Sequence, residues 1–114
     1  MTEETSQDIL FSPILIMEFI RQTAVNRSLN SENPETVTQF KLPKKYYDEI
    51  TAFPIQAQSI HLDIKYDEKT EILSIKPDQT VLQRFKEQKS LTEIAGKYEN
   101  QYKERYKKFI EILD

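Results

Sequence analysis

The stretch SLTEIAGKYENQYKERYKKFIEIL, residues 90–113, predicts one long amphipathic helix. Its apolar and aromatic residues recur at steps of three and four, which places them on one stripe of a 3.6-residue repeat. Ser90 followed by Glu93 forms a capping-box pattern, which is typical of a helix start. We therefore expect a C-terminal helix over about 91–113, whose apolar stripe covers the rest of the core.

Gly96, the only glycine of the chain, falls inside this predicted helix. Glycine in a helix interior is less favourable than alanine by about 1 kcal/mol, so its position needs a reason. Two interpretations remain open: another element approaches the helix closely at Gly96, or the helix bends there. A single glycine inside a helix also argues against a glycine-rich phosphate-binding loop.

Residues 57–76 have the alternation of a β-hairpin. Apolar side chains occupy every second position of its first strand, about 57–66: Ile60, Leu62, Ile64 and Tyr66. This period of two is typical of a strand with one buried face. A second strand, about 71–76, returns after a polar turn, Asp67 to Thr70. If Asp67 pairs with Thr70, Ile64 lies opposite Leu73, and both strands turn their aliphatic residues to one side.

The N-terminal third predicts a helix over about 13–25. Ser12 followed by Pro13 is typical of an N-cap and a first helical residue. Residues 14–20 are almost continuously apolar, a pattern that a buried strand also gives, so the two interpretations remain open and Ser-Pro favours the helix. Residues 1–8 are polar and charged, and we expect them to form a disordered tail.

The remaining segments complete an α+β domain that spans residues 1–114. Alternation over 36–42 predicts a strand, Pro43 ends it, and 44–51 has the pattern of a short helix. A further helix is expected from residue 79 to about 88. We therefore expect a small three-stranded antiparallel sheet packed against the long C-terminal helix.

Composition narrows the classes of function. The chain of 114 residues has no cysteine and a net charge of -3. These features argue against a disulfide framework, a thiolate metal site and a general attraction to nucleic acid. The acidic start is unlike a secretory signal, and the apolar run from residue 9 to 20 is too short to cross a bilayer. We expect a cytoplasmic protein without membrane association.

The sequence offers no set of residues for catalysis. His61 is the only histidine, and with Asp63 it supplies at most two ligands where structural zinc takes four. Paired carboxylates occur in predicted turns or on solvated helices, where the pKa shifts that acid–base chemistry needs are not expected. These pairs are Glu32 with Glu35, Asp48 with Glu49, and Asp67 with Glu68. We predict no enzyme activity, cofactor, metal or small-molecule substrate.

The leading hypothesis is a small intracellular protein–protein interaction module, with self-association as one form of that role. The N-terminal helix is more apolar than one side of a small sheet requires. Candidate partner contacts on it are Leu15, Met17 and Phe19. The competing interpretation is a central helix that the domain itself buries.

The alternative hypothesis is a nucleic-acid-binding domain. Cations interleave with tyrosines along the C-terminal helix, and single-strand binding combines cations with stacking aromatic rings. The candidate contacts are Lys97, Lys103, Arg105, Lys107 and Lys108, beside Tyr98, Tyr102 and Tyr106. The tyrosines also fall on the apolar stripe, where rings normally pack inward.

Overall fold

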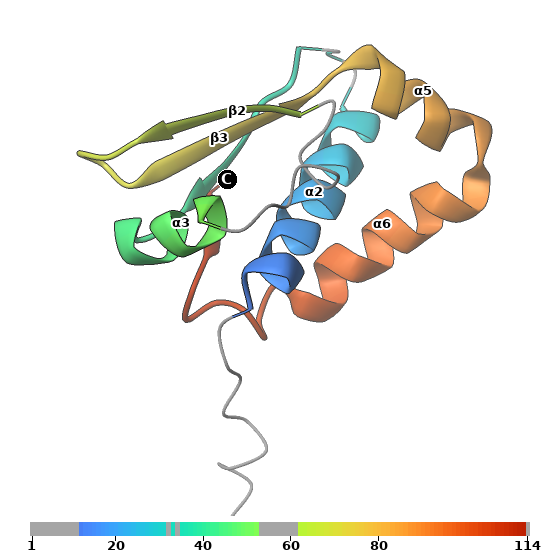
Figure 1. Cartoon of the computed structure of the whole chain (residues 1–114). Coiled ribbons are helices and arrows are strands. Elements are labelled where there is room, and N and C mark those ends of the chain that lie inside the picture. Colours follow the sequence, from blue (N-terminus) through green and yellow to red (C-terminus); the bar gives the residue numbers. More distant parts are fainter. Residues whose placement is uncertain (1–11, 32, 34, 53–61, 114) are drawn as a thin grey trace, which may run out of the picture.

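The computed structural model describes residues 12–31, 33, 35–52 and 62–113. Within these ranges, helices pack on a four-stranded antiparallel sheet, so the expected α+β fold is confirmed (Figure 1). The elements follow one another as α2 (Pro13–Leu29), β1 (Thr38–Lys41), α3 (Lys44–Thr51), β2 (Leu62–Asp67), β3 (Ile72–Pro77), α5 (Gln79–Glu87), α6 (Lys89–Tyr102) and β4 (Glu111–Leu113). None of the helices in the described ranges is long and apolar enough to cross a membrane.

The sheet has the strand order β2-β3-β1-β4, one strand more than the sequence predicted. β3 and β1 are the central strands, and Phe40 of β1 lies opposite Leu73 of β3 on one side and Ile112 of β4 on the other. β2 and β4 therefore form the two edges. The predicted strands 36–42 and 71–76 correspond to β1 and β3, and the predicted segment 57–61 lies outside the described residues.

The C-terminal helix is shorter than the sequence predicted. α6 ends at Tyr102, residues 103–109 form turns, and β4 follows at Glu111–Leu113. Phe109 and Ile110 are both buried, and β4 pairs with β1. A helix continued through these residues would carry the β4 backbone away from β1, so long-range pairing overrides the local helical pattern.

The start of α6 also differs from the expectation. The N-cap is Gln88, and no side chain caps the helix, so the predicted capping box does not form. Thr92 instead donates its hydroxyl to the carbonyl oxygen of Phe85 in α5, at 2.9 Å. α6 continues through Gly96, where an added Cβ would lie 3.4 Å from Asn26 Oδ1. The close-approach interpretation of Gly96 fits this contact with α2.

α2 confirms the helix predicted at the N-terminus and extends to Leu29. Ser12 caps it by accepting a hydrogen bond from the Leu15 amide at 3.4 Å, with Pro13 in the first turn. α2 packs against β3 and β1 and also against α6, so it is the central helix of the domain. The position over the sheet that we expected for the C-terminal helix is therefore held by α2, and α6 packs against α2 (Figure 1).

The hairpin register differs from the expectation by two residues. Ile64 lies opposite Ile75, and Asp67 lies opposite Ile72. A four-residue turn causes the shift: the Glu71 amide donates to the Asp67 carbonyl at 2.7 Å, and Glu71 has a φ of 59°. A two-residue turn needs positive φ at its centre, usually from Gly or Asn, and this chain has neither there. Because side chains alternate with period two, a shift of two leaves the apolar face unchanged.

Candidate interaction surfaces

The three candidate contacts on α2 do not share one surface. Leu15 is 49% exposed, whereas Met17 is 3% and Phe19 0% exposed. The Phe19 ring packs edge-on against Phe40 of β1 and Tyr106, with ring centroids 6.4 and 5.5 Å apart. The interpretation of α2 as a central buried helix holds for Met17 and Phe19, and only Leu15 offers area to a partner.

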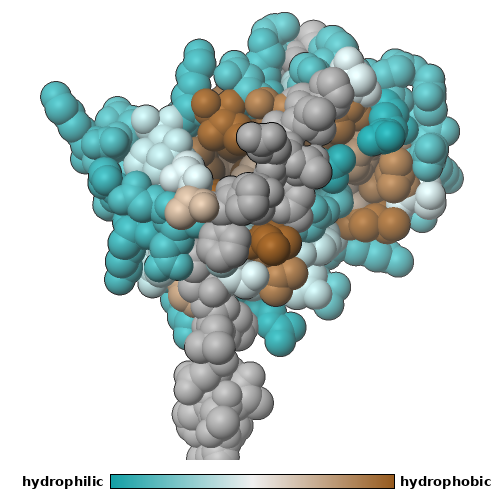
Figure 2. All heavy atoms as spheres, viewed as in Figure 1, coloured by the Kyte–Doolittle hydropathy of each residue, from teal (hydrophilic) through white to brown (hydrophobic). Residues whose placement is uncertain are grey.

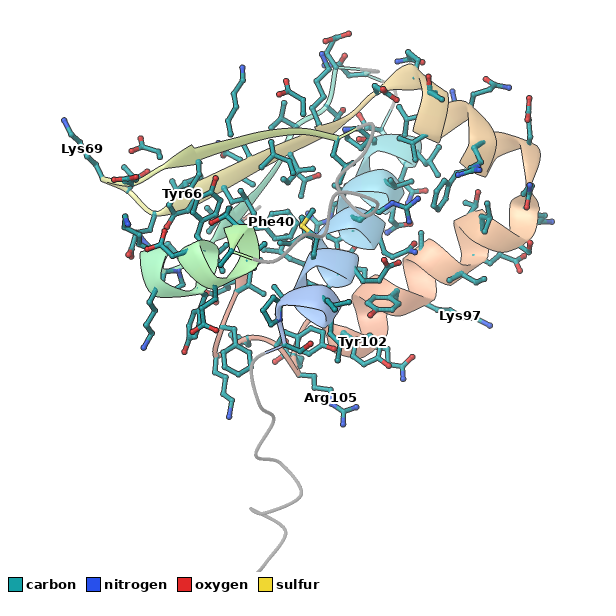
Figure 3. All side chains as sticks on the ribbon, in the orientation of Figure 1. Phe40, Tyr66, Lys69, Lys97, Tyr102 and Arg105 are labelled. Carbon is teal, nitrogen blue, oxygen red and sulfur yellow. The ribbon has the colours of Figure 1, made fainter. Side chains whose placement is uncertain are left out.

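The candidate cations of the C-terminal region are all exposed. Lys97 lies on α6, and the other four lie in the turns of residues 103–109. The Arg105 guanidinium lies 5.9 Å from the centroid of the Tyr102 ring. In Figure 3, Lys97 and Arg105 point away from the body of the molecule near Tyr102. Among the described residues, none of these cations forms an ion pair.

The tyrosines that interleave with these cations pack on one another. Ring centroids are 4.6 Å apart for Tyr98 and Tyr102, and 5.4 Å apart for the stacked pair Tyr102 and Tyr106. Tyr106 belongs to the main hydrophobic core, and the partly buried Tyr98 and Tyr102 pack against it. Burial raises the pKa of Tyr98 to about 12 and also raises that of Tyr106. The rings are therefore engaged in packing, and the cations are the accessible part of this region.

A buried carboxylate joins α2 to α6. Glu99 accepts hydrogen bonds at Oε2 from Arg27, at 2.9 Å from Nη2 and 3.1 Å from Nε. Asn26 Nδ2 donates to Glu99 Oε1 at 2.8 Å. Both carboxylate oxygens thus have partners, and the Glu99 side chain is buried. This arrangement fixes the two helices against each other, and sequence reasoning missed it because its members are more than 70 positions apart.

The strand β2 forms a sheet edge of six residues. Among the described residues it pairs with β3 alone. Its inward side chains Leu62, Ile64 and Tyr66 are only half-buried, whereas Leu73 and Ile75 on β3 are 2% and 0% exposed. The same alternation therefore gives a row of buried apolar side chains on β3 and an incompletely covered apolar row on β2.

Tyr66 is held firmly at this edge. Its hydroxyl donates to the Leu42 carbonyl oxygen at 2.5 Å, and its ring stacks on Tyr47 of α3 with centroids 3.9 Å apart. Desolvation by burial, with nearby carboxylates such as Glu71 adding to it, raises the pKa of Tyr66 to about 12. The end of β2 nearest the turn is therefore anchored to α3 and to the segment after β1.

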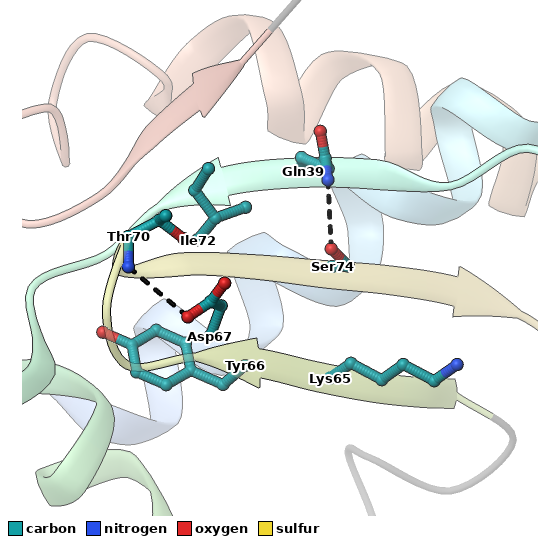
Figure 4. A pocket seen from close by; sticks show the side chains of 7 residues that line it. All are labelled: Gln39, Lys65, Tyr66, Asp67, Thr70, Ile72 and Ser74. Atoms are coloured by element: carbon teal, nitrogen blue, oxygen red, sulfur yellow. Dashed lines mark hydrogen bonds between the residues drawn. The ribbon is translucent and has the colours of Figure 1, made fainter.

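The outward side of β2 carries charges of alternating sign: Asp63, Lys65 and Asp67, all exposed. Beside them lies a shallow hollow of about 360 Å³ on the outer face of the sheet (Figure 4). It is lined by Gln39, Lys65, Tyr66, Asp67, Thr70, Ile72 and Ser74.

The space-filling view shows hydrophilic side chains at the hairpin end and apolar residues nearer α2 (Figure 2).

The candidate metal-ligating and acidic side chains of the described residues lie apart or exposed to solvent. No three metal-ligating side chains cluster within these ranges. The acidic pairs Asp48 with Glu49 and Asp67 with Glu68 are exposed, as expected of solvated charge. His61 and Glu32 lie outside the described residues.

Comparison of the chain with protein-family models, with curated proteins and with solved structures finds no match in any of the three.

Proposed function

We propose that this protein is a small protein–protein interaction module that binds its partner along the edge of β2 that no described strand occupies. The observation that carries the proposal is the incompletely covered apolar row of this edge strand, Leu62, Ile64 and Tyr66. A partner strand laid beside β2 would cover that row and pair with its outward backbone groups. In this proposal the protein acts in the cytoplasm by binding and not by catalysis.

Strand addition at a sheet edge has two components. Main-chain hydrogen bonds supply affinity, and alternate side chains supply specificity. β2 offers six residues for such pairing, whereas the opposite edge, β4, has only three. The anchoring of Tyr66 to the Leu42 carbonyl and to Tyr47 keeps this edge in place before a partner arrives, which lowers the entropy that binding costs.

The charges on β2 suit a specific partner better than unspecific pairing. Exposed charges on an edge strand discourage association with arbitrary strands. They also favour a partner whose charges alternate in the opposite order, because opposite charges across a strand pair are favourable and like charges are not. Asp63, Lys65 and Asp67 therefore act as a filter on which strand can bind.

A capture experiment with matched variants tests this proposal. The tagged protein is incubated with a lysate of its source cells, and the bound proteins are compared for wild type, Lys65→Glu and Lys69→Glu. Lys69 lies in the hairpin turn outside β2, so its variant changes the charge equally without touching the edge. We expect Lys65→Glu alone to lose a bound protein. Equal recovery of the same proteins by all three would contradict the proposal.

Nucleic-acid binding is the second candidate, and the exposed cations of the C-terminal region, which form no ion pair with another described residue, favour it. Neutralising phosphates with these cations would make affinity fall steeply as salt rises. The measurement is binding of a labelled single-stranded oligonucleotide over a series of salt concentrations, with Lys97→Glu combined with Arg105→Glu as the variant. Absence of binding at low salt would exclude this candidate.

A further inference from the structure

We infer that the strand that binds the β2 edge is β2 of a second copy of this chain, in the antiparallel register that sets Ile64 opposite Ile64 of the second copy. This inference rests on the proposed function, because it names the partner of the same edge. Its evidence is the charge order along β2 and the half-buried apolar row on the same strand.

Symmetry limits how β2 can pair with itself. A two-fold dimer pairs the same surface of both copies, and two identical strands then run antiparallel around the axis. Residues directly opposite each other must lie on the same face of the joined sheet. Each permitted register therefore has one residue opposite its own copy. Only the registers centred on Ile64 and Lys65 pair five of the six residues of β2.

The charges separate these two registers. With Ile64 at the centre, Asp63 lies opposite Lys65 of the second copy, and Lys65 lies opposite Asp63 of the second copy. With Lys65 at the centre, Lys65 faces Lys65 of the second copy and Asp63 faces Asp67 of the second copy. The first register makes opposite-charge pairs and the second makes only like-charge contacts, so cross-strand electrostatics selects the register centred on Ile64.

The apolar row agrees with this choice. In the register centred on Ile64, that residue packs on Ile64 of the second copy, and Leu62 packs on Tyr66 of the second copy. These three side chains are the half-buried ones of β2. The Asp63 carboxylate and the Lys65 ammonium group are exposed, and within the described part of the chain neither lies within ion-pair distance of an opposite charge. Inside the chain Asp63 lies opposite Lys76 of β3, and Lys65 lies opposite Ser74.

Light scattering after size-exclusion chromatography tests the dimer directly. One chain has a mass of 13.6 kDa, and we expect wild type to approach twice that mass as concentration rises. Lys65→Glu and Asp63→Lys each turn both opposite-charge pairs into like-charge pairs. Each should raise the dissociation constant roughly tenfold or more. Lys69→Glu, at the exposed turn, should dimerise like wild type.

Mixing the two variants tests the register. In a heterodimer of Lys65→Glu with Asp63→Lys, every charge of one strand again meets its opposite, so the mixture should dimerise although each variant alone does not. A register centred on Tyr66 would pair Lys65 with Asp67 and leave Asp63 without a partner on β2, so Asp63→Lys alone would then dimerise like wild type. Circular dichroism confirms that each variant is folded. A mixture that stays monomeric, or wild type that stays monomeric at all concentrations, overturns the inference.

The two proposals fail in distinguishable ways. Monomeric wild type that still captures a different protein through Lys65 would overturn the second copy as partner and leave the β2 edge as the binding surface. Monomeric wild type without any capture that depends on Lys65 would overturn both.

Discussion

β2 and β3 are neighbouring strands of one hairpin with the same alternation of apolar and polar residues, yet they lie in different environments. β3 has a strand on each side and α2 over its apolar face, and Ile75 there is fully buried. β2 has β3 on one side, and its apolar row is half-buried. The pattern alone therefore identifies strands, and position in the sheet decides how completely an apolar row is buried.

The largest expected effect on stability comes from truncating an isoleucine in the apolar row of β3, compared with one in the apolar row of β2. Ile75→Ala should lower the free energy of unfolding by about 4 kcal/mol, because it removes fully buried methyl groups and leaves a cavity. Ile64→Ala should cost roughly half of that in dilute solution, since Ile64 is only half-buried. Urea unfolding curves of both variants at low protein concentration measure the difference. Equal losses would mean that the two strands are equally covered in the single chain.

The next prediction compares the stability lost when the buried charge of Glu99 is removed with that lost when the charge of Asp63 at the sheet edge is removed. Glu99→Gln should destabilise the fold by about 2 kcal/mol, because Arg27 loses its charged acceptor between α2 and α6. Arg27 is partly exposed, which keeps the loss below that of a fully buried pair. Asp63→Asn on the edge should change stability by less than about 0.5 kcal/mol in the monomer. Thermal unfolding at low concentration checks both, and a larger loss for Asp63→Asn would contradict this assignment.

A smaller effect concerns the anchoring of the edge. Tyr66→Phe removes the hydroxyl that donates to the Leu42 carbonyl and keeps the ring stacked on Tyr47. We expect a loss of about 1 kcal/mol, which is typical of one hydrogen bond. Tyr47→Phe is the matched control, since it also removes one tyrosine hydroxyl. The assignment fails if Tyr66→Phe unfolds at the same urea concentration as wild type.

The last prediction concerns alkaline pH. Tyr66 and Tyr98 have a pKa of about 12 in the folded chain, whereas unfolded tyrosine has a pKa of about 10. Between these values the unfolded chain releases protons that the folded chain retains, so stability should fall as pH rises from about 10 to 12. Below pH 10 this contribution is fully present. Absorbance of tyrosinate during a pH titration should show late ionisation of Tyr66, Tyr98 and Tyr106, whose pKa values are all raised, and one late group fewer in Tyr66→Phe.

Much of the fold could be predicted where the signals are local. Ser12-Pro13 marks the start of α2, and the alternation of apolar residues identifies β2 and β3. Local signals fail at Tyr102, where neither proline nor glycine stops the helix and the end depends on pairing between β4 and β1. They also fail at the turn between β2 and β3, because the residue with positive φ there is Glu71 and not a glycine that the sequence would reveal.

The candidate site was less predictable than the fold. The apolar excess of α2 suggested a contact surface, but Met17 and Phe19 are needed for the core between α2 and the sheet. That β2 is an edge follows only from the strand order, which depends on contacts between β1 and β3 that no local pattern encodes. The spacing of residues in the sequence predicts the strand and its charges. Only the strand order shows that this strand lies at an edge of the sheet.

Amide hydrogen exchange of the hairpin, measured by NMR at low and at high protein concentration, tests the central claim most directly. We expect the β3 amides to be protected at both concentrations, and the outward amides of β2 to become protected only at the high concentration. Protection of β2 that is the same at both concentrations would contradict the claim that this edge pairs with a second copy.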